Sequence, residues 1–249
     1  MPQSRCRTDV NVADGVTTLW LDHPPVNALD LELLDAIVAT MPRIQGPVVI
    51  TGAGKCFSAG VDLRAIIDGG PEHTDHFLTA LSAAFLAIFD HPAPVVAAIN
   101  GHAIAGGCVF AMSADMRLMS AGTIGLTELS VGVPFPVAAL EICRYAMGTS
   151  ATRAVLESAS VDVDTASIRG WIDAVVQDTD LIPRAIATAR GLGKHSPAAY
   201  AATKKQLHRT ARAAIDAGAE TDATVRASWM VDETRARITA FLDALARDR

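Results

Sequence analysis

The segment NGHAIAGGCVFAMSADMRLMSAGTIGLTELSVG, residues 100–132, combines two features that suit enolate chemistry. The pair Gly106-Gly107 precedes an apolar run and predicts a helix N-terminus, where free backbone N–H groups stabilise developing negative charge. Glu128 follows among apolar residues, and a desolvated carboxylate is a stronger base than a hydrated one. The segment therefore predicts an N–H-lined anion hole together with one buried base.

Two interpretations of Glu128 stay open at this level. A carboxylate directly after Thr127 is also typical of the first turn of a helix, where it stabilises the N-terminus. The neighbours of Glu128, including Leu126 and Leu129, are however an unusual setting for a surface charge. Because a buried charge is costly unless it is paired or used, the functional interpretation has as much support as the structural one.

Composition limits the class of protein. The chain has 249 residues, of which 50% are apolar and 19% charged, enough for one large domain or a domain with a helical appendage. A net charge of −6 and only 5% aromatic residues argue against nucleic-acid binding. Four cysteines without paired spacing, no leader-like apolar start and no long apolar run predict reduced thiols, no membrane span and a cytoplasmic location.

The order of predicted elements indicates an α/β fold. Two short β-prone runs, 8–12 and 17–22, flank Asp14-Gly15 and predict a hairpin. The apolar runs 47–51 and 94–99 predict buried strands, and each ends at a glycine-bearing turn. The pattern of strand, glycine turn and helix occurs twice, which indicates repeated ββα-like turns. The further predicted elements are helices at 74–90, 106–113, 140–148, 151–158, 165–170, 182–192, 197–209 and within 213–247, and strands at 116–119 and 171–176.

Other motifs give weaker signals. The glycines at 52, 54 and 60 do not match a dinucleotide fingerprint, so an ordinary turn is the better interpretation of that loop. His73 and His76 have no third ligand at a defined spacing, so they predict no metal site. His102 is more typical of a hydrogen-bonded turn residue than of a base, and Ser58 has no obvious partner for nucleophilic catalysis.

Four segments together resemble the crotonase, or enoyl-CoA hydratase/isomerase, superfamily over nearly the whole chain. They are HPPVNALDLELL (23–34), GKCFSAGVDL (54–63), PVVAAINGHAIAGGCVFAMSADMRL (94–118) and IGLTELSVGVPFP (124–136). The resemblance implies an α/β fold, a crotonase-type spiral of ββα turns with a C-terminal helical trimerisation region. Residues 1–195 would form the core with the acyl-CoA site, and residues 196–249 the helices for assembly into a homotrimer or a dimer of trimers.

The resemblance also implies the site. The substrate would be an acyl thioester of coenzyme A, with coenzyme A as part of the substrate and no separate cofactor or metal. The backbone N–H groups of Val61 and Gly106 would hold the thioester oxygen, and Glu128 would carry the proton. The resemblance further implies that the coenzyme-bearing substrate would be bound by Val26, Ala28, Ala59, Gly60, Val61, Asp62, Leu63 and Gly106.

Departures from the family pattern favour one reaction. Hydratases of the family use two glutamates, and the first of these positions is Val109 here. One carboxylate suffices to shift a double bond, so the chain looks closest to the Δ3,Δ2-enoyl-CoA isomerases, with the alternatives of an enoyl-CoA hydratase (a lyase) or a non-catalytic acyl-CoA-binding member. The family's frequent cation before the first proline is replaced by His23, and Lys55, Lys204 and Lys205 are unranked candidates for the coenzyme phosphates.

Overall fold

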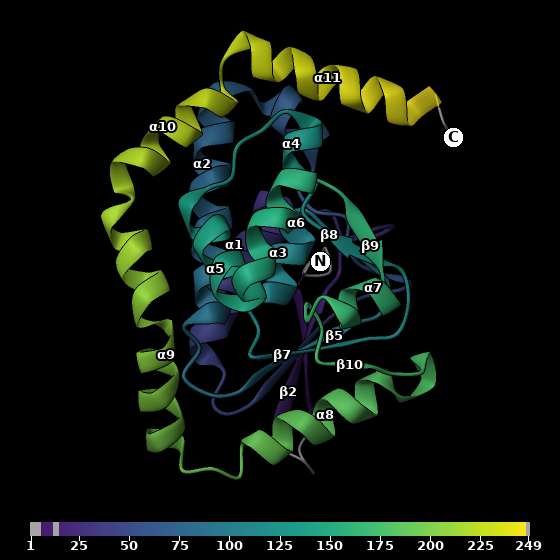
Figure 1. Cartoon of the computed structure of the whole chain (residues 1–249), viewed down its shortest axis with the longest axis vertical. Helices are drawn as coiled ribbons and strands as arrows, with labels where there is room; N and C mark the ends of the chain where they lie inside the picture. The colour runs from purple at the N-terminus through teal and green to yellow at the C-terminus, as the bar shows by residue number, and fades with distance from the viewer. Residues whose placement is uncertain (1–5, 12–14, 248–249) are drawn as a thin grey trace.

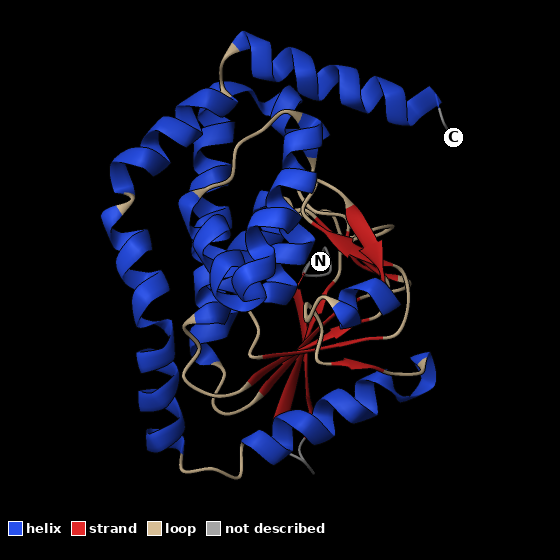
Figure 2. Cartoon of the chain, in the orientation of Figure 1, coloured by secondary structure: helices blue, strands red, loops and turns tan. Residues whose placement is uncertain are grey.

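The computed structural model describes residues 6–11 and 15–247, and side chains from residue 15 onward. Within this part of the chain the strands form two sheets (Figures 1 and 2). The larger sheet has the order β1-β2-β3-β5-β7-β10, in which β1 is antiparallel to β2 and the other pairs are parallel. Its strands are β1 (Cys6–Asn11), β2 (Val16–Leu21), β3 (Val48–Gly52), β5 (Val95–Ile99), β7 (Met116–Met119) and β10 (Ala174–Val175).

The smaller sheet has the order β4-β6-β8-β9, with β9 antiparallel to β8. Its strands are β4 (Cys56–Ser58), β6 (His102–Ile104), β8 (Thr123–Gly125) and β9 (Ser160–Asp162). Three times in succession the chain adds one strand to the larger sheet and one to the smaller sheet, and then enters a helix. This succession confirms the predicted ββα turns.

The helices cover both faces of the larger sheet (Figure 2). They are α1 (Leu31–Thr40), α2 (Leu63–Phe89), α3 (Gly106–Met112), α4 (Glu128–Val131), α5 (Val137–Met147), α6 (Ala151–Glu157), α7 (Val163–Ile168), α8 (Leu181–Leu192), α9 (Pro197–Ala217), α10 (Ala219–Trp229) and α11 (Asp232–Arg247). The three 3₁₀ turns described are Met41–Arg43, Gly148–Ser150 and Asp178–Asp180. None of the helices in the described ranges combines the length and the apolar character that crossing a bilayer requires.

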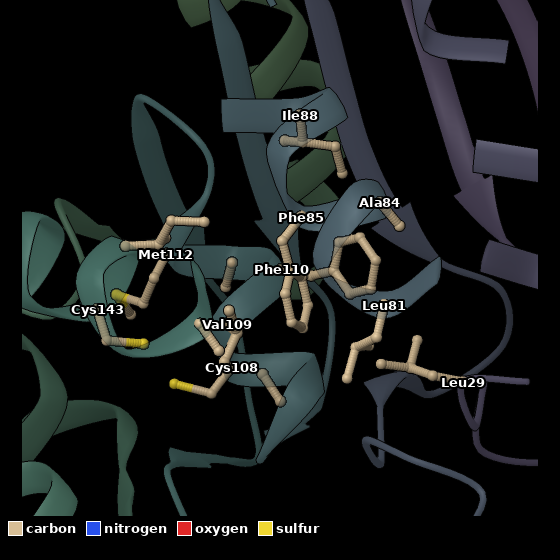
Figure 3. Close-up of a cluster of buried hydrophobic side chains, with 14 of the residues drawn as sticks. Leu29, Leu81, Ala84, Phe85, Ile88, Cys108, Val109, Phe110, Met112 and Cys143 are labelled. Atoms are coloured by element: carbon tan, nitrogen blue, oxygen red, sulfur yellow. The ribbon is translucent and has the colours of Figure 1, made fainter. Parts of the chain in front are cut away.

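The alternation of side chains along β3 explains its continuous apolar sequence. Val48 and Ile50 point into the main core, whereas Val49 packs in a second core with Ala185 of α8. A strand buried on both faces needs apolar side chains at every position. In the main core the ring of Phe85 from α2 meets Phe110 of α3 edge to face, with centroids 4.8 Å apart (Figure 3).

Some elements differ from the sequence-based predictions. Helix α2 begins at Leu63 instead of residue 74, because the Asp62 carboxylate accepts hydrogen bonds from the N–H groups of Arg64 and Ala65. Gly70, whose φ is +74°, precedes Pro71 and forms a kink inside this helix. The strand expected at 171–176 is only Ala174–Val175. The three-residue strands of the smaller sheet were not predicted.

The expected N-terminal hairpin is confirmed by the pairing of β1 with β2, although its turn residue Asp14 and Val12 lie outside the described residues. Cys56, Cys108 and Cys143 are buried free thiols, as expected; the side chain of Cys6 lies outside the described part.

The C-terminal helices surround the core of their own chain. Helix α9 packs against α5, α10 against α2 and α5, and α11 against α2 and α4. Figure 1 shows α11 crossing one end of the molecule close to α4, the short helix that begins with Glu128. The last helices of the chain therefore reach a segment about 100 residues earlier in the sequence.

Asn27 offers a test of the loop packing on which this fold depends. Its buried Nδ2 donates to the carbonyl oxygens of Ala53 (2.9 Å) and Cys56 (2.7 Å), and its Oδ1 accepts from the N–H of His23 (3.0 Å). We expect Asn27→Ala to lower the free energy of unfolding by about 2–4 kcal/mol, because it leaves buried backbone groups without partners. Urea titration measures this loss.

The exposed amide of Gln45 provides the matched control. Gln45→Ala should change the free energy of unfolding by less than about 0.5 kcal/mol. Equal stability of the two variants would show that the Asn27 bonds do not hold these loops.

Candidate active site

A cavity of about 260 Å³ lies between the ββα core and the C-terminal helices. Most of its lining is apolar, and its residues come from five parts of the chain. They are Ala59, Val61, Leu63, Leu81, Phe85, Ile104, Ala105, Gly106, Val109, Thr127, Glu128, Val131, Val133, Pro136, Ala139, Trp229, Phe241 and Leu245. The cavity therefore contains Glu128, Val61 and Gly106, three of the residues that the sequence singled out.

Glu128 is the first residue of α4 and is 8% exposed. Its Oε2 is buried and has no hydrogen-bond partner among the described residues. Burial raises the pKa of Glu128 from 4.5 to about 8, against the opposing effect of hydrogen bonds from the backbone N–H groups of Glu128 and Thr127. A carboxylate with such a pKa is a stronger base than an exposed one and exchanges protons near neutral pH.

The N–H of Gly106 is at the start of α3. Helix α3 begins at this residue, and the preceding Ala105 has a φ of +50°. Neither Gly106 nor Val61 uses its N–H in a backbone hydrogen bond within the described part of the chain. Val61 forms an isolated bridge with Leu29, in which the bonds are made by the neighbours Gly60 and Asp62. Two unbonded N–H groups thus border the same cavity as Glu128.

Close packing of two backbone segments brings these N–H groups together. A Cβ added at Gly60, whose φ is +83°, would lie 2.6 Å from the carbonyl oxygen of Ile104 and 3.2 Å from the nitrogen of Gly106. A Cβ at Gly107 would lie 2.4 Å from the carbonyl oxygen of Ser58. Real Cβ atoms do not approach other atoms so closely, so both positions require glycine.

Val109 belongs to the same cavity wall and is buried. Among the described residues that line the cavity, Glu128 is the only one with a titratable side chain. The indole N–H of Trp229 is already donated to the carbonyl oxygen of Pro134 at 2.9 Å. The cavity consequently offers one acid/base group in apolar surroundings.

The other residues expected to contact a coenzyme lie in two adjacent segments. Ala59, Val61 and Leu63 line the cavity, whereas Gly60 and Asp62 lie between them along the chain. The N–H of Ala59 donates to the carbonyl oxygen of Val26 at 3.0 Å, and the N–H of Leu29 donates to that of Gly60 at 2.8 Å. These bonds hold the segment 26–29, which includes Ala28, beside the segment 59–62.

Alternative candidate residues lie elsewhere. The exposed His102 is paired with the Thr123 hydroxyl at 3.0 Å, and the Ser58 hydroxyl donates to the carbonyl oxygen of Asn27 at 2.7 Å. Lys204 is buried and its ammonium group forms an ion pair with Asp115 at 2.9 Å, so it is not a free cation on the surface. None of the three side chains lines the cavity with Glu128.

Sequence reasoning missed five lining residues: Leu81, Phe85, Trp229, Phe241 and Leu245. Leu81 and Phe85 belong to the helix predicted at 74–90. The amphipathic pattern of this helix indicated that they are buried, but not that they line a cavity with Glu128. Phe241 and Leu245 are four residues apart on α11, a spacing that places both on one helix face. That spacing is a sequence signal that could have indicated a shared apolar target for the two side chains.

Comparisons with known proteins agree with this geometry. The family model described as "Enoyl-CoA hydratase/isomerase" matches residues 11–247. A putative enoyl-CoA hydratase of Thermus thermophilus is 29% identical over 80% of this chain and 83% of its own length. Enoyl-CoA delta isomerase 1 of Rattus norvegicus, a mitochondrial protein, is 28% identical over 69% of this chain and 63% of its own length.

A solved structure supports the fold independently. The human mitochondrial delta3-delta2-enoyl-CoA isomerase superposes with a TM-score of 0.92 over 98% of this chain and 99% of that chain, at 23% identity. At this identity the likeness establishes the fold, and it confirms the predicted α/β architecture with C-terminal helices.

The pKa of Glu128 predicts how stability depends on pH. The folded chain keeps the proton of Glu128 up to about pH 8, whereas an unfolded chain releases it near pH 4.5. The contribution of the protonated Glu128 to the free energy of unfolding is therefore complete below pH 4.5 and is lost as the pH rises through 8. Glu128→Gln has no charge to bury. We expect its free energy of unfolding, relative to the unsubstituted chain, to rise by about 3–5 kcal/mol between pH 5 and pH 9.

Denaturant titration across this pH range makes the measurement. Glu141→Gln is the matched control, because Glu141 is a partly exposed residue paired with Arg144 and should change the relative stability by less than about 1 kcal/mol. Parallel pH dependence of the Glu128→Gln variant and the unsubstituted chain would contradict the burial of a charge at this site.

Proposed function

Because this chain belongs to the enoyl-CoA hydratase/isomerase family, we propose that it moves the double bond of a 3-enoyl-CoA thioester to the 2-trans position. One observation carries the proposal: within the described part of the chain, the cavity has a single titratable side chain, Glu128. An allylic shift needs one group that removes a proton and returns it. Coenzyme A is part of the substrate in this reaction, and no separate cofactor takes part.

The proposed mechanism uses Glu128 twice. Its carboxylate removes a proton from C2 of the 3-enoyl thioester, and the electron pair moves onto the thioester oxygen to give a dienolate. The resulting carboxylic acid then delivers the proton to C4. The electrons return from the oxygen, the C2=C3 bond forms and the carboxylate is regenerated. The free Oε2 atom supports this role, because no hydrogen bond within the described residues has to break first.

The N–H groups of Val61 and Gly106 are proposed to stabilise the dienolate oxygen. Both lie at the cavity without a backbone partner in the described ranges, and that of Gly106 is at the start of α3. Donors fixed by the fold need no reorganisation as the charge develops, and one such donor typically contributes a factor of about 100 to 1000 in rate. The side chain of residue 61 plays no part in this interaction.

Val109 supports isomerisation over hydration. Hydration requires a water molecule held by acid/base groups opposite the double bond, and the side chain at position 109 offers no polar atom. An apolar wall also disfavours water in the cavity, which protects the dienolate from side reactions. Glu128 alone is therefore better suited to a proton shuttle than to the addition of water.

Hydratase activity is the second candidate, because the relative from Thermus thermophilus is described as a putative enoyl-CoA hydratase. A third possibility is a family member that binds acyl-CoA without turnover. The raised pKa of Glu128 speaks against a purely structural role, since a buried carboxylate lowers stability at neutral and alkaline pH. Comparing isomerisation and hydration rates on the same preparation distinguishes all three.

The segments 26–29 and 59–63 are proposed to bind the coenzyme part of the substrate, since they lie side by side next to the cavity. Asp62 also caps α2, so its backbone is the part available for this role. We also propose that residues 1–195 form the core and that residues 196–249 form a helical region through which the chain assembles into a homotrimer or a dimer of trimers.

We further propose a cytoplasmic location.

The sharpest test is Glu128→Gln. Incubation with 3-enoyl-CoA should give a conjugated thioester that absorbs in the ultraviolet, and the variant should lower kcat by about 10²- to 10⁴-fold through loss of the base. Glu141→Gln, outside the cavity, should keep the rate of the unsubstituted chain. Similar rates for the two variants would remove Glu128 from the mechanism, and hydration of 2-enoyl-CoA faster than isomerisation would favour the hydratase.

The pH profile provides a separate test. The base must be ionised to take the proton at C2, so kcat/KM should rise with pH and level off above an apparent pKa of about 8. Steady-state rates between pH 5.5 and 9.5 measure this value. A profile that is already flat above pH 6 would mean that Glu128 ionises as an exposed carboxylate does.

A further inference from the structure

The cavity beside Glu128 has an open end and a closed end. Leu245, near the end of α11, is 46% exposed, whereas Phe85, Val109 and Ala139 are buried. We infer that the closed end limits the substrate to short and medium acyl chains of at most about ten carbons, and that Ala139 and Phe85 set this limit. This inference rests on the proposed acyl-CoA function.

Phe85 forms a wall that cannot move aside. Its side chain is fully buried, and its ring packs edge to face on Phe110 at 4.8 Å (Figure 3). Leu81, one turn earlier on α2, lies beside it in the same core. Because cores are close-packed, a longer acyl chain cannot displace this ring without disturbing the packing between α2 and α3.

Trp229 closes the cavity from the C-terminal side. It is the last residue of α10, it is 2% exposed, and its N–H donates to the carbonyl oxygen of Pro134 at 2.9 Å. Helix α10 is tied to α2 by the ion pair between Arg226 and Asp75. The indole is therefore fixed by both a hydrogen bond and its helix.

Helix α11 forms the remaining wall. Its Phe241 and Leu245 line the cavity, and Ile238 is fully buried in the core. The Arg235 guanidinium donates to the carbonyl oxygen of Ile67 at 2.8 Å, which joins α11 to α2. Helix α11, which carries Phe241 and Leu245, is thus fixed to α2, the helix that carries Phe85.

The volume sets the size of the acyl group. An apolar protein cavity of about 150 Å³ holds benzene with its six carbons, so by the same proportion 260 Å³ holds about ten carbons. Each methylene buried in such a cavity strengthens binding about fourfold. Affinity should therefore rise with chain length until the closed end is reached and then stop rising.

Ala139 is the position at which the limit can be changed. It lies on α5, is 2% exposed and lines the cavity, and its small side chain leaves space that a larger residue would fill. Leucine at this position adds three carbon atoms and should remove room for about three methylenes. Ala146, also on α5 but partly exposed and not in the cavity lining, is the matched control.

The test is calorimetric titration of the full chain with saturated straight-chain acyl-CoAs of 4 to 16 carbons, which bind without turnover. We expect affinity to increase about fourfold per methylene up to eight to ten carbons and to increase no further at 12 to 16 carbons. Ala139→Leu should weaken decanoyl-CoA binding at least about tenfold and leave butyryl-CoA within about twofold, while Ala146→Leu changes neither. Phe85→Leu, which shortens the wall, should extend the limit by one or two carbons.

The outcomes separate this inference from the proposed reaction. Affinity that continues to rise to 16 carbons, equal effects of Ala139→Leu on all chain lengths, or no binding of any acyl-CoA would overturn the length limit. If the limit and its shift are observed but 3-enoyl-CoA is not converted, the inference stands and the isomerase proposal fails. Melting temperatures of the variants identify any that do not fold, and Ala139→Val then replaces Ala139→Leu.

Discussion

The close approach of two backbone segments is the constraint on which the site depends. Residues 58–61 and 104–107 pack so tightly that Gly60 and Gly107 have no room for a Cβ. This packing places the nitrogens of Val61 and Gly106 at one cavity, unbonded to other backbone groups in the described ranges. The segments follow β4 and β6, neighbours in the smaller sheet, so the sheet register determines the position of both N–H groups.

The burial of Glu128 follows from the same architecture. Helix α4 is a single turn that ends at Gly132, and α11 covers it from the C-terminal side. Because α11 packs against α4, it contributes to the burial that raises the pKa of Glu128. The C-terminal helices therefore contribute to the electrostatics of the site as well as to its shape. Among the described residues, the cavity has one acid/base side chain and two N–H donors, the groups that the proposed proton shuttle requires.

The rest of the fold must offset the loss of stability that the burial of Glu128 causes. A buried ionisable group reduces stability when it is charged, and the surrounding core must compensate for it. The core does so with fully buried aromatic residues, among them Phe85 and Phe110, directly behind the cavity. Phe85 both packs in this core and lines the cavity, so the packing of the core also determines the space available for a substrate.

The sequence by itself determined the repeated ββα turns, the helix start at Gly106 and the apolar surroundings of Glu128, because local periodicity and glycine positions encode them. It also indicated, through the resemblance, that Val61 and Gly106 belong to one site, and the structure brings both to the cavity of Glu128. Only the tertiary structure decided which residues line a cavity together with this carboxylate. Trp229 and Phe241 lie about 100 residues from Glu128 in the chain, and the three-residue strands exist only through their partners. Such contacts depend on how distant elements pack, and no local spacing encodes them.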